Sequence, residues 1–229
     1  MKRSEINQII REAEQFLQAH QYILPEFAYW TPKDWAKKGT ECTEIRENML
    51  GWDITDYGMG DFSKIGLLLV TVRNGNQKNP EKYPKPYAEK IMIVREEQVT
   101  PMHYHWSKME DIINRGGGQL DIQLYESKNG NELDQEREIC VSMDGVKKIV
   151  PAGGIVTLLP GSSITLTPGL YHRFWGKPGH GTVLVGEVSM CNDDNTDNSF
   201  YDNVGRFPKI EEDEPPYRYL CTEYPAAKD

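Results

Sequence analysis

Two histidines separated by one residue, His103 and His105, are the feature that most constrains how this chain can fold. On a β-strand, residues two apart project from the same face, so both imidazoles point the same way. Glu110 follows after a short turn, and His172 comes much later, after a Pro-Gly pair. Side chains so far apart in the chain meet only where their strands lie side by side. The spacing therefore predicts a metal site assembled across a β-sheet.

The chain from residue 65 onward has the pattern of many short strands. Apolar and β-branched runs are separated by Gly, Pro, Asn and Asp turns, and Asp144-Gly145 is typical of a tight hairpin. This pattern favours a barrel or a sandwich, so the expected fold class is mainly β. The expected strands cover residues 65–73, 88–95, 98–105, 119–126, 139–143, 155–159, 163–167, 172–175 and 182–189.

The first sixty residues predict helices instead. Residues 1–20 carry one apolar stripe at helical spacing, with Ser4 as the expected N-cap, and Thr31-Pro32 predicts the start of a second helix. We expect the stripe to pack on the outside of the sheet or on a partner subunit. The expected domains are residues 1–60, a helical extension packed on the barrel, and residues 61–229, a barrel with an acidic tail. Within that tail, the run 211–214 is typical of a solvated surface.

The composition excludes some classes of function. The 229 residues carry 35 Asp plus Glu against 26 Lys plus Arg, and a net charge of -9 repels nucleic-acid phosphates. No run approaches the ~18 apolar residues of a membrane span, and the polar N-terminus is not typical of a signal peptide. The four cysteines show no paired spacing, as expected for reduced thiols. We expect a cytoplasmic protein that binds neither nucleic acid nor membrane.

The expected metal ligands are His103, His105, Glu110 and His172. Three imidazoles and one carboxylate, with no thiolate, suit Mn, Fe, Co, Ni or Zn. Four protein ligands leave two positions open on an octahedral ion, and these can hold two oxygens of one substrate. The alternative for an isolated HxH is a pair of polar residues on a solvated strand face.

The same residues, together with Gly117, resemble the two motifs of the cupins: HxH with a glutamate and a glycine downstream, then a Pro-Gly turn and a histidine. The resemblance covers residues 90–189. It implies a cupin, that is, a jelly-roll-like β-barrel, here with N-terminal α-helices. Two departures concern loop shape rather than ligands. The glycine that usually precedes HxH is absent, and the proline and glycine of the second motif are adjacent.

The whole chain resembles a narrower family, the cupin-type D-lyxose ketol-isomerases. This resemblance implies a manganese-dependent aldose–ketose isomerase that interconverts D-lyxose with D-xylulose and D-mannose with D-fructose. It also implies a homodimer acting on a neutral sugar. The matching stretches are Leu50–Asp53, Tyr87–Met92, Val99–His103, Glu110–Gly118, Pro168–His172, Val185–Ser189 and Asp213–Pro215.

Three residues are catalytic candidates for that chemistry. Isomerisation moves a hydrogen between C1 and C2, and a carboxylate near both carbons can act as base and then as acid. Glu110 and Glu187 are the candidates, and Lys90 can stabilise a substrate oxygen. Glu187 shares its strand face with valines and Lys90 with apolar residues, where an unpaired charge is costly. The alternatives are a solvated outer face for Glu187 and a surface lysine for Lys90.

Two further residues are candidates for binding the sugar. The polar run 192–198 follows the Glu187 strand and is expected at the barrel rim, which makes Asp194 a candidate for sugar hydroxyls. The alternative, a turn-forming loop, fits this run as well. Arg206 can reach the site from the same segment, and Lys90 is a third candidate.

Three other functions fit parts of the pattern. A sugar-phosphate isomerase of the same fold would need a basic cluster or an amide cradle for the phosphate. An iron-dependent cupin dioxygenase could use the same ligands, with oxygen-dependent turnover. A non-catalytic sugar-binding cupin would bind metal and sugar without turnover. The residues alone do not choose between an enediol and a hydride shift.

Overall fold

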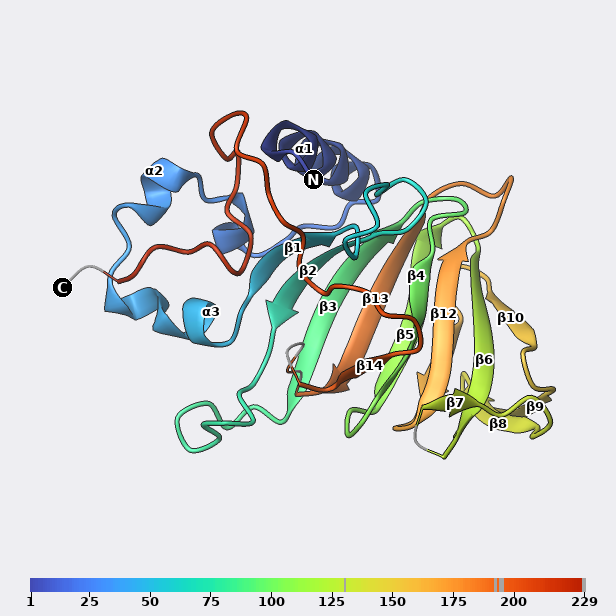
Figure 1. Ribbon diagram of the computed structural model, residues 1–229. Coiled ribbons are helices and arrows are strands. Elements are labelled where there is room, and N and C mark those ends of the chain that lie inside the picture. Colours follow the sequence, from blue (N-terminus) through green and yellow to red (C-terminus); the bar gives the residue numbers. More distant parts are fainter. Residues whose placement is uncertain (130, 192, 194–195, 228–229) are drawn as a thin grey trace.

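The computed structural model describes residues 1–129, 131–191, 193 and 196–227. Strands make up most of the regular structure, with helices on one side (Figure 1), so the mainly β expectation is confirmed. The strands are β1 (Gly51–Thr55), β2 (Leu67–Arg73), β3 (Tyr87–Val94), β4 (Thr100–His105), β5 (Glu110–Gly117), β6 (Leu120–Lys128), β7 (Glu132–Leu133), β8 (Ile139–Met143), β9 (Val146–Val150), β10 (Ile155–Leu158), β11 (Ser163–Leu166), β12 (Leu170–Gly176), β13 (Val183–Met190) and β14 (Asn198–Phe200).

The strands form two antiparallel sheets. The larger sheet has the order β1-β2-β3-β13-β5-β11-β8-β9, and the smaller one has the order β10-β6-β12-β4-β14, with β7 beside β6. Apolar side chains from both sheets meet in one core, among them Met92 and Ile112 from the larger sheet and Leu120 and Phe174 from the smaller. The two sheets therefore face each other around a shared interior, as in a jelly roll.

The helices are α1 (Arg3–Ala19), α2 (Pro32–Trp35) and α3 (Thr43–Glu47), with 3-10 turns at Glu26–Tyr29 and Thr40–Cys42. As expected, the apolar stripe of α1 packs on the outer face of the larger sheet, where Ile6 and Ile10 join a cluster with Leu68, Ile91 and Leu184. Each fully buried side chain of this size contributes about 1.5–3 kcal/mol. Within the described residues, no helix has the length and apolar character that a membrane crossing requires.

The predicted helix start at Thr31 and the predicted hairpin turn at Asp144 both form as expected. Thr31 and Asp34 form a capping box at the start of α2. Asp144 and Gly145 join β8 to β9 with φ of 50° and 80°, the left-handed backbone that a two-residue hairpin requires.

The longest strand that the sequence analysis missed is β5. The polar, glycine-ending stretch 110–117 gave no strand pattern, yet it forms β5, paired with β13 and β11. The reason is that its inward polar residues are satisfied inside the fold. Asn114, for example, is buried and donates to the carbonyl oxygens of Gly118 and Leu158. The shorter strands β7, β9 and β14 were not among the expected strands either.

The expectation for Ser4 was wrong, whereas the acidic run 211–214 is exposed as expected. Lys2 is the N-cap of α1, and Ser4 instead donates its backbone N–H and its hydroxyl to Asp213. In the same run Glu212 accepts from Arg3 and Glu214 accepts from Asn7. The acidic run therefore lies at the surface, as expected, and α1 supplies hydrogen-bond donors to three of its side chains.

Arg3 is the centre of this contact. It is only 1% exposed and its guanidinium pairs with both Glu212 and Glu223, the first at 2.7 Å. The tail thus runs beside the start of the chain. The division into two domains at residue 60 stays a proposal. β1 lies in the first of these domains and pairs with β2 in the second.

Replacing Arg3 by Met should lower the free energy of unfolding by about 2–3 kcal/mol. Loss of one partner from a buried pair costs ~3–5 kcal/mol, and the 58% exposure of the Glu212 side chain reduces that cost. Urea unfolding measures the change. The matched control is Lys64→Met, which removes an exposed ion pair to Asp61 and should cost less than about 1 kcal/mol. Equal losses in the two variants would show that the buried arginine has no special role.

Candidate metal centre and active site

Three histidines converge in the interior between the sheets. His103 and His105 project from one face of β4, and His172 on β12 lies directly opposite His103 in antiparallel register. All three are buried, and one ring nitrogen from each lies within 4.8 Å of the other two. The structure thus brings together the three predicted imidazoles in a group that could hold a metal ion.

Backbone carbonyls fix the orientation of two of these rings. The Nδ1 atom of His103 lies 2.8 Å from the carbonyl oxygen of Pro101, and that of His172 lies 3.0 Å from the carbonyl oxygen of Leu170. A carbonyl oxygen only accepts, so Nδ1 carries the proton and Nε2 keeps its lone pair. Nε2 of His172 is buried and makes no hydrogen bond to any described residue. A buried lone pair without a donor is costly, and a cation would satisfy it.

Glu110 completes the predicted set. It is the first residue of β5, and its Oε1 atom lies 3.4 Å from Nε2 of His105 and 3.2 Å from Nε2 of His172. One carboxylate oxygen therefore faces the ring nitrogens. This donor set of imidazoles and carboxylate fits a divalent first-row metal.

The protonation states also suit a cation. Burial lowers the pKa of His103 well below 6.5, and burial likewise lowers the pKa of His105. Burial alone would raise the pKa of Glu110, but the positive charge of Lys108 is the foremost of the interactions that outweigh it, and the pKa of this carboxyl lies well below 4.5. At neutral pH the two rings are neutral and the carboxylate is ionised, which are the metal-binding forms.

Glu187 and Lys90 lie beside this group. They are direct cross-strand partners on β13 and β3, and both are buried. Lys90 Nζ lies 3.5 Å from Glu187 Oε1. Both side chains therefore point into the interior, as expected from the apolar residues on the same strand faces, and each offsets the other's charge.

Lys108 is a buried residue of the site that sequence analysis missed. Its Nζ lies 2.7 Å from Glu110 Oε2 and 2.9 Å from Glu187 Oε1, and the residue is 1% exposed. In the sequence it is one lysine in the turn between β4 and β5, with no feature to separate it from a solvated lysine. The only available signal was its position two residues before Glu110.

Asp197 holds the turn that carries Lys108. Its carboxylate accepts from the backbone N–H and hydroxyl of Ser107, at 2.9 and 2.7 Å, and from the backbone N–H of Lys108 at 3.2 Å. Its Oδ2 atom also lies 3.8 Å from Nδ1 of His105. Asp197 thus belongs to the polar run 192–198 and serves as a structural support for the site.

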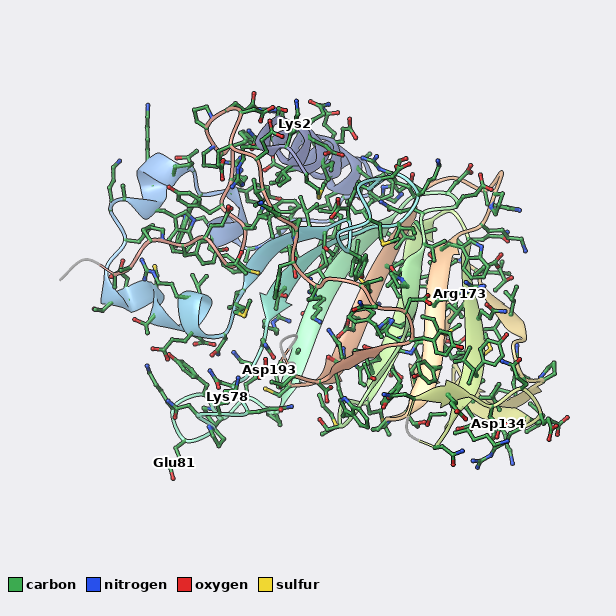
Figure 2. The ribbon with its side chains drawn as sticks, viewed as in Figure 1. Lys2, Lys78, Glu81, Asp134, Arg173 and Asp193 are labelled. Atoms are coloured by element: carbon green, nitrogen blue, oxygen red, sulfur yellow. The ribbon has the colours of Figure 1, made fainter. Side chains whose placement is uncertain are left out.

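Of the two remaining predicted site residues, the structure describes Arg206 but not Asp194. Arg206 lines the same cavity, of about 40 Å³, as His103 and Lys90, and its guanidinium pairs with the buried carboxylate of Asp53 at 2.5 Å. Asp194 lies outside the described residues. Its neighbour Asp193 points to Lys78 (Figure 2), with Nζ and Oδ2 2.7 Å apart.

The fold matches known sugar isomerases. L-ribose isomerase from Acinetobacter sp. DL28, solved with L-ribose, superposes with a TM-score of 0.60 over 92% of this chain and 98% of that chain, at 15% identity. The Geodermatophilus obscurus L-ribose isomerase gives 0.57 at 14% identity, with the same coverage. The class defined by fold and site is therefore a cupin with a candidate three-histidine metal centre.

Sequence comparison narrows this class. A family model described as D-lyxose isomerase matches residues 1–224. Two relatives named D-lyxose/D-mannose isomerase are 47% identical (Serratia proteamaculans) and 48% identical (Escherichia coli O157:H7), each over 98% of both chains. The chain belongs to the D-lyxose isomerase family and is a sugar isomerase.

Metal-free protein should lose stability as the pH falls through 6.5. The folded pKa values of His103 and His105 are lowered, so near and below pH 6.5 the unfolded chain takes up protons that the folded chain does not. Their contribution is present above pH 6.5 and is lost below it, by up to about 1.4 kcal/mol per pH unit for each ring. Thermal unfolding of chelator-treated protein from pH 8 to 5 measures this. The double variant His103→Gln/His105→Gln should weaken the dependence of the unfolding midpoint on pH. His180→Gln, at an exposed position, should leave this dependence unchanged. A wild-type midpoint unchanged between pH 7 and 5.5 would contradict the prediction.

Proposed function

We propose that the protein is a metal-dependent aldose–ketose isomerase that interconverts D-lyxose and D-xylulose, and also D-mannose and D-fructose. The observation that carries the proposal is a group of three buried imidazoles, two of which line a cavity together with two carboxylates and two ammonium groups, in a D-lyxose isomerase family member. The names of the relatives support the choice of sugars.

His103, His105, Glu110 and His172 would hold the metal, and Mn²⁺ is the ion that we propose. When bound, such an ion polarises the sugar carbonyl and stabilises the enediolate charge on O1 and O2. The carbonyl contacts at Nδ1 of His103 and His172 keep these rings in the orientation that ligation requires.

We propose Glu187 as the proton carrier. Its carboxylate removes the proton from C2 of the aldose and returns it to C1, while a proton passes from O2 to O1, which balances the reaction. Glu110 is the second catalytic candidate, although its two oxygens already face the ring nitrogens and Lys108. Lys90 stands where an ammonium can stabilise a negative substrate oxygen.

The rest of the sugar would be bound by Lys90, Arg206 and Asp194. Arg206 lines the cavity with a guanidinium that Asp53 orients. Two further points stay proposals: a homodimer, which size-exclusion chromatography with light scattering would test, and a cytoplasmic location, supported by four cysteines that are all free.

The first test is turnover of D-lyxose under anaerobic conditions. Chelator-stripped protein should be inactive, and added Mn²⁺ should restore conversion to D-xylulose. Restored activity without oxygen would exclude the dioxygenase, and turnover itself would exclude a mere sugar-binding protein. A folded, metal-loaded protein that leaves D-lyxose and D-mannose unchanged would overturn the proposal and direct assays to phosphorylated sugars.

Variants separate metal binding from proton transfer. His103→Ala or His172→Ala should abolish Mn²⁺ binding and activity together, because each removes a ligand. Glu187→Gln keeps the side-chain shape and should retain Mn²⁺ while kcat falls by about 10²–10⁴-fold, the range for a lost general base. Near-full activity of Glu187→Gln, with no deuterium from D₂O at C1 of the product, would instead indicate a hydride shift.

A further inference from the structure

Lys108 joins the two carboxylates to which the proposed function gives different tasks. Its ammonium nitrogen lies 2.7 Å from Glu110 Oε2 and 2.9 Å from Glu187 Oε1. The turn after β4, the first residue of β5 and the middle of β13 therefore meet at a single buried nitrogen. An ammonium has three donors, so it can serve both carboxylates at once.

The two oxygens of Glu110 face different partners. Oε1 lies 3.2–3.4 Å from the Nε2 atoms of His172 and His105, whereas Oε2 lies against Lys108. A carboxylate held in this way presents one oxygen to the centre between the imidazoles. Without the lysine, the side chain could turn and present both oxygens.

The ammonium is itself held in place. The backbone N–H of Lys108 donates to Asp197 Oδ2, and the same carboxylate accepts from Ser107. Because Lys108 is 1% exposed, water does not compete strongly for its donors. The position of Lys108 is thus fixed by the hydrogen bond of its own backbone. A residue that orients other side chains must itself be held in this way.

Charge balance favours the same role. Lys90, Lys108, Glu110 and Glu187 are all buried and carry two positive and two negative charges. Lys90 Nζ is 3.5 Å from Glu187, a longer contact than the 2.9 Å of Lys108. Lys108 is therefore the nearer cation for Glu187 and also a direct cation for Glu110.

We propose that Lys108 is a positioning residue that presents Glu110 to the metal through one oxygen and holds Glu187 beside the reacting carbons. This inference rests on the proposed tasks of Glu110 and Glu187. Lys108 acts through these carboxylates, so its loss should impair the chemical step more than sugar binding.

Replacement of Lys108 by Met tests the proposal, because Met retains an unbranched apolar side chain and removes the ammonium. With Mn²⁺ at saturation, kcat should fall about 100-fold, the cost of a misplaced catalytic group, and KM should change less than about threefold. Mn²⁺ should still bind, since three imidazoles remain. The EPR spectrum of bound Mn²⁺ should change, because Glu110 is free to turn. Lys64→Met, at an exposed site, is the control for Lys→Met replacement.

A double-mutant cycle separates the positioning of Glu187 by Lys108 from an independent contribution of Lys108 to kcat. In the Glu187→Gln background, Lys108→Met should lower kcat by less than about fivefold, because the proposed proton carrier, one of the two carboxylates that Lys108 positions, is already lost. The double variant also removes one charge of each sign, so its buried charge stays balanced. If Lys108→Met alone fails to fold, Lys108→Gln and the double variant give the same comparison.

Two results would overturn the proposal: a full 100-fold loss in the Glu187→Gln background, or an unchanged Mn²⁺ spectrum with a raised KM as the main effect. The second would indicate a lysine that binds the sugar directly. Failure of the proposed function is distinguishable, because wild-type protein would then leave D-lyxose unchanged. The Mn²⁺ spectra of wild type and Lys108→Met would still report whether Lys108 orients Glu110.

Discussion

The pairing of β4 with β12 is the constraint on which the site depends. In this antiparallel register His172 lies opposite His103, and β14 on the other side of β4 places Phe200 opposite His103. A shift by one residue would turn each histidine to the outer face of its strand. The hydrogen-bonded ladder, rather than any contact between the rings, therefore fixes where the imidazoles meet.

Once the imidazoles meet in a dry interior, the charges around them must balance. Glu110 and Glu187 are stable there as carboxylates because Lys108 and Lys90 lie within ion-pair distance. The same requirement explains why Glu187 and Lys90 interrupt strand faces that are otherwise largely apolar. Low water content also strengthens each remaining contact, so the arrangement is rigid as well as charged.

Strand periodicity in the sequence predicted the fold class and the inward direction of Glu187 and Lys90, and helical periodicity predicted the packing of α1. Strand periodicity did not predict β5, because Asn114 is polar and one of its partners, the carbonyl oxygen of Leu158, lies on β10, far along the chain. Lys108 was missed for a similar reason: a lysine in a turn is buried only if two carboxylates from other strands arrive beside it. The alternation of residues along a strand indicates which face of the sheet each side chain lies on. Its cross-strand partners depend on the register of pairing, which a single sequence does not reveal.

The C-terminal segment links this register to the ends of the chain. Asp197 supports the turn of Lys108, and Arg206 then reaches Asp53 on β1, at the opposite edge of the larger sheet from β9. Farther along, Glu212 of the acidic run pairs with Arg3 at the start of α1, and the C-terminal segment passes beside α1 (Figure 1). The helix and the tail thus anchor both sides of the segment that completes the site. An N-terminal helix far from the metal centre in sequence is for this reason part of what keeps Arg206 and Asp197 in place.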